Sequence, residues 1–277
     1  ISDSITRNFA SIMVCVYLRS SAENRVVLAA SLAARFGSRL IGIAAEAATL
    51  PYLEDGLAIT RSILVENARN AAMEDVARAE MNFQRGAGHL RDIEWRSDIQ
   101  APAYFIPSQA RAADLLVVAR PSAEAPRQSM RIDPGDIIME LGRPVLIVPQ
   151  DARKLLARNV VIAWKNTREA RRAVLDALPF LQQAEMVTML SVGEDASDQG
   201  AEDVCAHLTH HGVVCQDVVR TSRSGSYADA IIDTAVEEGS DLIVAGAYGH
   251  NRMREWILGG VTVDLLARSP VPCLMSN

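Results

Sequence analysis

The sequence lacks the excess of basic residues that proteins binding a nucleic-acid backbone usually carry. Its 277 residues include 28 Lys and Arg against 34 Asp and Glu, so the formal charge is -6. It also lacks any apolar run approaching the roughly 18 residues that span a bilayer, because charged residues or glycine interrupt every hydrophobic segment. We therefore expect neither nucleic acid nor a membrane among its partners.

Features of an exported protein are missing as well. Residues 1–9 contain no apolar segment of the kind found in secretion signals. The four cysteines, Cys15, Cys205, Cys215 and Cys273, show no CxxC spacing, and Cys15 and Cys273 lie in apolar runs typical of strands. We interpret the cysteines as buried free thiols in a reducing compartment, and we expect a cytoplasmic location.

The sequence contains no recognisable catalytic signature: no GxSxG, no Walker Lys-Ser pair and no Ser/His/Asp order. His207, His210 and His211 lie at helical spacing near Cys205. A glycine follows them, however, and histidines in the last turn of a helix usually face solvent, so we assign no metal site. We predict no catalytic residue from these patterns.

An internal repeat is the strongest feature that is present. Residues 113–119 (ADLLVVA) match residues 240–246 (SDLIVAG) at a shift of 127 residues, and residues 143–149 (RPVLIVP) match residues 269–275 (SPVPCLM) at a shift of 126. Two nearly equal shifts indicate a duplication. A charged stretch over residues 150–159 separates the copies, so we predict two domains, residues 1–150 and residues 151–277.

Short apolar runs alternate with amphipathic stretches in each copy, which predicts the fold class. Apolar runs without polar alternation, separated by helical periodicity, are typical of a parallel sheet covered on both faces. Each half is therefore expected to be an α/β domain with a doubly wound parallel sheet. The strands predicted in the second half are Val160 to Trp164, Glu185 to Val192, Val213 to Arg220, Leu242 to Gly246 and Val271 to Met275.

A long helical pattern distinguishes the first half. Over residues 57–85, apolar residues recur three to five positions apart, which predicts an amphipathic helix with one face on the core. The residues of that face are Ile59, Ile63, Ala68, Ala72, Val76 and Ala79.

A glycine-rich loop follows the predicted strand at residues 242–246. Gly246 and Gly249 precede a span of nine residues, and Gly259 and Gly260 then open a helix. Glycines let the backbone approach a phosphate, and a helix N-terminus adds partial positive charge. The alternative is a tight connection that uses glycine for positive φ. The strand before the loop and the helix after it favour the phosphate site.

The spacing G-x2-G-x9-G resembles the universal stress protein family, and Gly246, Gly249 and Gly259 fit it. The resemblance covers nearly the whole chain as a tandem of two such domains. It implies two doubly wound domains of the adenine nucleotide alpha hydrolase-like type. The family includes members that bind ATP and members that do not.

The resemblance implies an adenine nucleotide, ATP or AMP, with or without magnesium, bound by the second half in a regulatory stress-response role. The phosphates are then expected on backbone N–H groups of the glycine loop, and the adenine between Ala163 and Val192. The predicted site residues are Ala163, Trp164, Lys165, Val192, Gly246, Gly249, His250, Gly259, Gly260, Val261 and Thr262.

The second half departs from the family pattern at two positions. Gly260 stands where the family has a small hydroxyl residue, and Thr262 either replaces that hydroxyl or caps the helix. Lys165 stands where nucleotide-binding members usually carry an Asp near the ribose. A lysine cannot accept a hydrogen bond from ribose but can pair with a phosphate.

The first half looks degenerate as a nucleotide site. Arg120-Pro121 follows its fourth strand in place of the glycines, and Asp133-Pro134-Gly135-Asp136 replaces the second part of the loop. Proline removes a donor, and the carboxylates repel an anion. We therefore expect Gly259→Asp to abolish nucleotide binding and Gly135→Asp to leave it unchanged.

Two other functions stay open: a structural interaction module that binds no nucleotide, and a slow ATP hydrolase. Without a recognisable general base we expect slow turnover, and a ligand-dependent conformation of residues 250–258 presented to unidentified protein partners. Members of the resembled family commonly dimerise through their last strand, so the resemblance implies that residues 145–148 and 271–275 pair within this chain as a pseudo-dimer; a further homodimer stays open.

Overall fold

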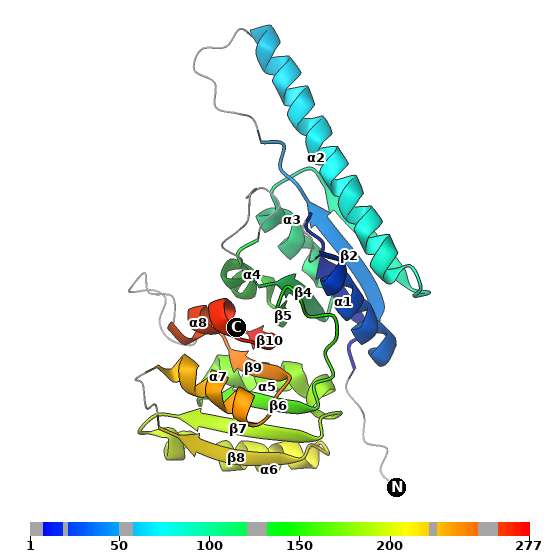
Figure 1. The fold of residues 1–277 in the computed structure, drawn as a ribbon. Coiled ribbons are helices and arrows are strands. Elements are labelled where there is room, and N and C mark those ends of the chain that lie inside the picture. Colours follow the sequence, from blue (N-terminus) through cyan, green and yellow to red (C-terminus); the bar gives the residue numbers. More distant parts are fainter. Residues whose placement is uncertain (1–7, 19–21, 50–57, 121–131, 222–225, 249–259) are drawn as a thin grey trace.

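The computed structural model describes residues 8–18, 22–49, 58–120, 132–221, 226–248 and 260–277, without the side chains of residues 58–61 (Figure 1). The strands of these segments form one ten-stranded sheet with the order β3-β2-β1-β4-β5-β10-β9-β6-β7-β8. The first half has the order β3-β2-β1-β4-β5, and the second half has the corresponding order β8-β7-β6-β9-β10, so the same strand order runs from each edge of the sheet to its centre. The repeat in the sequence therefore corresponds to a repeat in the sheet.

Each half contributes five strands to the sheet. In the first half they are β1 (Ser11–Cys15), β2 (Arg39–Ala45), β3 (Ile93–Asp98), β4 (Leu115–Ala119) and β5 (Val145–Val148). In the second half they are β6 (Asn159–Trp164), β7 (Met186–Val192), β8 (Cys215–Arg220), β9 (Leu242–Gly246) and β10 (Cys273–Ser276).

Helices cover both faces of the sheet. On one face lie α1 (Ala22–Phe36), α2 (Ala58–Ala87), α5 (Arg168–Leu181) and α6 (Ala201–His210). On the other lie α3 (Pro102–Gln109), α4 (Pro134–Leu141), α7 (Tyr227–Glu237) and α8 (Gly260–Arg268). Two short 3-10 helices are η1 (Ala110–Ala112) and η2 (Ala196–Gln199).

Two hydrophobic cores, one on each face, result from the alternation of side chains along the strands. Ile12 and Val14 of β1 join the core under α1, whereas Met13 and Cys15 join the opposite core. All four are fully buried. Both cores extend through both halves, and within each half neighbouring strands pair in parallel. This is the doubly wound α/β class that the apolar runs predicted.

The two halves join through their last strands, as the sequence predicted. β5 and β10 pair antiparallel, with Leu146 opposite Leu274. On the α1 and α5 side, the rings of Phe9, Phe36 and Phe180 pack in a triangle with centroids 5.2 to 5.3 Å apart. Because β5 and β10 pair, each half covers the sheet edge that the other half would otherwise leave open. The division of the chain between residues 150 and 151 stays a prediction.

Helix α2 departs from the expected pattern of burial. Ala72, Val76 and Ala79 are buried as predicted, but Ile63 is 54% exposed, because the N-terminal part of α2 extends past the sheet (Figure 1). A 30-residue helix is about 45 Å long, whereas a seven-residue strand such as β2 covers about 23 Å. Among the described residues, no helix combines the length and apolarity needed to cross a membrane.

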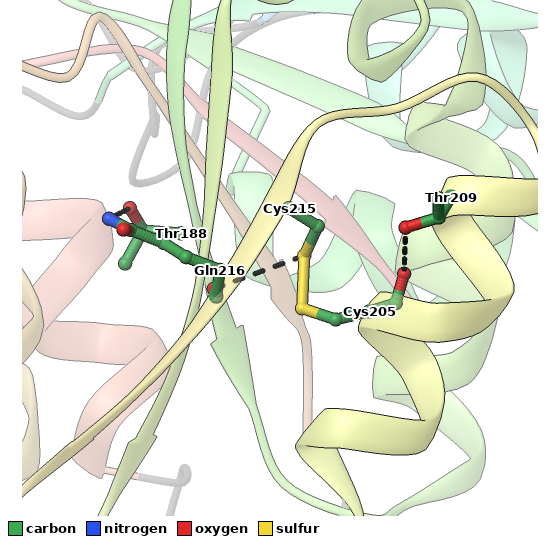
Figure 2. Close-up of a disulfide and its surroundings, with 5 residues drawn as sticks. All are labelled: Thr188, Cys205, Thr209, Cys215 and Gln216. Carbon is green, nitrogen blue, oxygen red and sulfur yellow. Dashed lines mark hydrogen bonds between the residues drawn. A yellow bond between two sulfur atoms is a disulfide. The ribbon is translucent and has the colours of Figure 1, made fainter.

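The cysteine prediction is correct for two residues and wrong for the other two. Cys15 and Cys273 are free and buried. Cys205 on α6 and Cys215 at the start of β8 form a disulfide, with their Cα atoms 5.3 Å apart (Figure 2). The chain reverses at Gly212, which has φ +78°, and this turn brings the strand against the helix it has just left. Sequence spacing alone does not show this proximity.

Candidate functional site

A pocket of ≈ 770 Å³ lies at the carboxyl ends of β6, β7 and β9. In an open parallel sheet this edge is where ligands bind, because the loops after the strands leave room between them. The first turn of α8 also lines the pocket. Eight residues predicted from the sequence line the pocket: Ala163, Trp164, Lys165, Val192, Gly246, Gly260, Val261 and Thr262.

The remaining three predicted residues, Gly249, His250 and Gly259, lie outside the described residues, as does the predicted switch segment 250–258. The described part of the glycine loop is therefore its two ends, at β9 and at α8. These ends bracket one side of the pocket.

Gly246, at the end of β9, is required by packing. A β-carbon at this position would overlap the backbone nitrogen of Ala170, in the first turn of α5. That turn begins at Thr167, whose hydroxyl oxygen accepts a hydrogen bond from the Ala170 N–H at 3.2 Å. Gly246 thus allows α5 to approach the end of β9. Packing of the pocket walls requires this glycine, whether or not a ligand is bound.

Tyr248 is a pocket residue that the sequence analysis did not single out. It has φ +61°, a left-handed conformation that is uncommon outside glycine, and it is 9% exposed. Its backbone N–H is 3.5 Å from the Thr262 hydroxyl oxygen, which accepts the hydrogen bond. Thr262, 6% exposed and in the first turn of α8, therefore holds the backbone of the residue that follows β9 by two positions.

The ring of Tyr248 reaches the first half of the molecule. Its hydroxyl occupies the space where a β-carbon of Gly135 would lie, in the first turn of α4. The Asp133 carboxylate caps this turn by accepting a hydrogen bond from the Gly135 N–H at 2.7 Å. The expectation that Gly135→Asp leaves nucleotide binding unchanged stays a prediction, and this contact bears on it, because a side chain at Gly135 would meet the hydroxyl of a pocket residue.

The wall after β7 is held in place by Trp164. Its indole N–H donates a hydrogen bond to the Gln199 carbonyl oxygen at 2.8 Å, and the Gln199 side-chain oxygen accepts one from the Asn166 N–H at 3.0 Å. Trp164 is 5% exposed and packs in the core under α5. It is a packing residue that fixes η2 at the pocket, and its indole is not a stacking surface open to a ligand.

The rim of the pocket carries charges of both signs. Lys165 lies on the side of β6, and Glu194 and Asp195 lie on the side of β7; all three are exposed. Tyr227, at the start of α7, lies beside Gly193, where its ring is 3.1 Å from the position of a β-carbon. This rim can bind a molecule that has an anionic end and hydrogen-bond donors elsewhere.

The described residues form no cluster that could hold a metal ion, and the two free thiols are buried. No group of three or more His, Cys, Asp or Glu side chains in these segments could hold a metal ion. Burial raises the pKa of the Cys15 thiol to about 12 and that of the Cys273 thiol to about 11. Both stay protonated near neutral pH, and a protonated thiol is a poor nucleophile.

Comparisons with known proteins agree with this architecture. Residues 168–277 match the sequence profile of the Universal stress protein family. No curated protein gives a significant match to the chain. A universal stress protein structure from Archaeoglobus fulgidus, 16% identical, covers 96% of this chain and 96% of its own, with a TM-score of 0.66.

Two structures from Pseudomonas aeruginosa are also similar to this chain over nearly its full length. A functionally unknown protein, 15% identical, covers 97% of this chain and 92% of its own with a TM-score of 0.57. A putative universal stress protein, also 15% identical, covers 97% and 93% with a TM-score of 0.56. At these identities the likeness concerns the fold, and it extends over both halves of the chain.

Proposed function

We propose that the second half of the chain, in which residues 168–277 match the Universal stress protein family profile, binds an adenine nucleotide, ATP or AMP. One observation carries the proposal: eight residues chosen from the sequence for this ligand line a single pocket. They come from β6, β7, β9 and α8, and only the folding of the sheet brings them together.

The phosphates are assigned to the α8 end of the pocket. Gly260 and Val261 begin this nine-residue helix, whose first N–H groups have no partner within the helix. Apart from its own chain neighbours and the backbone of α8, no atom of the described residues lies within 4 Å of the position of a β-carbon at Gly260, so an anion can approach the backbone there. Lys165 on the opposite rim supplies a positive charge.

The base is assigned to the apolar side of the pocket. Ala163 and Val192 from adjacent strands line it together with Leu190 and Ile231. A flat aromatic base gains by leaving water for such a surface, and exposed polar groups nearby supply its hydrogen bonds. Glu194 and Asp195 can accept hydrogen bonds from an exocyclic amino group.

A charge placed at Gly260 tests this assignment. Isothermal titration with ATP, ADP and AMP should show binding to the unaltered chain. Gly260→Asp should weaken it at least about tenfold, because a carboxylate then meets the phosphates where no protein atom is displaced. Val263→Asp is the matched control: it adds the same charge to the same helix at a residue that is 36% exposed and outside the pocket.

The result that overturns the proposal is equally direct. If none of the three nucleotides binds the unaltered chain at millimolar concentration, the pocket does not serve nucleotides and the interaction-module function replaces the proposal. Binding that Gly260→Asp and Val263→Asp reduce equally would place the ligand elsewhere.

We expect turnover to be slow. The described pocket residues include no buried carboxylate or histidine that could act as a general base, and hydrolysis needs a positioned water and neutralised charge on the leaving group. Phosphate release measured with excess ATP should stay near the rate without protein. Fast release that Gly260→Asp abolishes would identify an ATP hydrolase instead.

A further inference from the structure

We propose that Cys205 and Cys215 form a reversible thiol–disulfide exchange site, which reacts with small-molecule thiols and disulfides and whose state controls two walls of the pocket. This inference concerns the pocket of the proposed function, but its first readout needs no nucleotide. Figure 2 shows the pair bridging α6 and the beginning of β8.

Both elements joined by this disulfide lead into the pocket wall. α6 begins directly after η2, and Asp195, Ala196 and Gln199 of that segment line the pocket. β8 ends at Arg220, and the next residue, Thr221, lines the pocket on the same side. The disulfide therefore ties together two elements that each have one end at the ligand space: the beginning of α6 and the end of β8.

β8 is the last strand of the described sheet, and β7 is the one described strand that it pairs with. At its end the Arg220 guanidinium donates to the Glu237 carboxylate of α7 at 2.9 Å. Gln216 adds one cross-strand bond, donating from its side-chain N–H to the Thr188 hydroxyl at 3.1 Å (Figure 2). Loss of the disulfide removes a covalent tie from an edge strand, the part of a sheet that opens most easily.

The position of the two sulfurs favours exchange at Cys215. Cys205 faces the core and is 8% exposed, whereas Cys215 is partly exposed at the first position of the edge strand. The chain has four cysteines in all. The other two, Cys15 and Cys273, lie fully buried inside strands of the sheet, so they do not compete for the reaction.

The exchange balances with two equivalents of a small thiol. A thiolate attacks the Cys215 sulfur, the bond to Cys205 breaks, and Cys205 leaves as a thiolate that takes up a proton. A second thiolate attacks the outer sulfur of the mixed disulfide on Cys215. The small-molecule disulfide is released, and Cys215 becomes a thiol after protonation. Oxidation by a small-molecule disulfide follows the same steps in reverse.

The first test uses the full-length chain in buffers of reduced and oxidised glutathione at graded ratios. Free thiols are alkylated and located by mass spectrometry. We expect Cys205 and Cys215 to change together in one two-electron transition within the range that glutathione covers. A pair that stays fully oxidised or fully reduced at every ratio would overturn the proposal.

The second test is hydrogen exchange without nucleotide. In the reduced chain, peptides covering residues 194–199 and 215–221 should exchange faster, and peptides of β9 and β10 should not change. The combined variant Cys205→Ala and Cys215→Ala should show the hydrogen-exchange rates of the reduced chain. These rates should not change with the ratio of reduced to oxidised glutathione. Equal exchange of residues 194–199 in both redox states would overturn the link to the pocket.

Nucleotide titration then measures the coupling. We expect reduction to weaken binding by about fivefold, the lower end of usual coupling between sites. If the unaltered chain binds no nucleotide in either state, only the proposed function fails, because the thiol titration and hydrogen exchange are independent of it. Equal affinity in both states would remove the control of ligand binding by this disulfide.

Discussion

The hydroxyl of Tyr248, a pocket residue of the second half, occupies the space that a β-carbon of Gly135 would fill in the first half. Gly135 lies in the first turn of α4, and Tyr248 follows β9 by two positions. The first half, which looks degenerate as a nucleotide site, thus supports the site of the other half. A glycine there is a requirement of close packing between the halves.

Gly135→Ala should therefore destabilise the chain by about 1–3 kcal/mol, the usual cost of overpacking a close contact. Urea unfolding of the full chain measures this change. In a Tyr248→Ala background the same substitution should cost little, because the ring no longer occupies the space. If the two substitutions change the free energy of unfolding additively, the contact between Tyr248 and Gly135 does not contribute to stability.

Gly246→Ala should destabilise the chain in the same way. The added carbon meets the backbone of Glu169 and Ala170, which cannot move away as a flexible side chain can. We expect a loss of about 2 kcal/mol in the free energy of unfolding. Gly260→Ala is the matched control: nothing lies within 4 Å of its β-carbon, so its stability should change by less than about 0.5 kcal/mol. Equal stability of both variants in a denaturant titration would contradict this assignment of Gly246.

Reduction of the disulfide should lower stability by about 3 kcal/mol. The cysteines are ten residues apart in sequence, and the chain-entropy relation for so short a loop predicts that amount. Denaturant unfolding with and without a reductant measures it. The variant with Cys205→Ala and Cys215→Ala should show no reductant effect; a reductant effect of the same size in that variant would assign the change to something other than this bond.

Alkylation of the two free thiols should depend steeply on pH. Burial raises the pKa of Cys273 from 9.0 to about 11 and that of Cys15 from 9.0 to about 12. At pH 9 about half of the unfolded thiols are ionised, against about 1% of folded Cys273 and about 0.1% of folded Cys15. Iodoacetamide at pH 9 should therefore modify both residues in guanidinium chloride and neither in the folded chain. Rapid modification of the folded chain would show that these thiols are not buried.

The same shifts give the sign of the pH effect on stability. A folded pKa above the unfolded value means that the folded state retains protons that the unfolded state has lost. The stability associated with the neutral buried thiols is therefore complete below pH 9. It decreases as the pH rises through the interval between 9 and the folded values. Substituting Cys273 by Ala should flatten this alkaline decrease, which thermal unfolding between pH 8 and 10 can follow.

Local patterns in the sequence were sufficient to predict most elements and much of the pocket. The predicted strand at residues 242–246 is β9, and the predicted strand at residues 160–164 is β6 with one residue added. These predictions succeed because a buried parallel strand leaves a continuous apolar run. Gly246 and Lys165 were predicted from the resemblance to the universal stress protein family, and both line the pocket because parallel strands end at one edge of the sheet.

Other features depend on contacts between distant segments, so no local pattern contains them. The proximity of Cys205 and Cys215 depends on how α6 packs against β8 after the reversal at Gly212. The exposure of Ile63 depends on the sheet being shorter than α2. Tyr248 acquires a partner in α4 only because β5 and β10 pair.

By itself, then, the sequence determined the doubly wound class, the duplication and the edge of the sheet at which a ligand is expected, because periodicity and glycine spacing are properties of short segments. Only the tertiary structure decided that Tyr248 reaches from one half to the other and that Cys205 and Cys215 meet between α6 and β8. The physical reason is that these contacts depend on how helices and strands pack against one another, which no short pattern in the sequence contains.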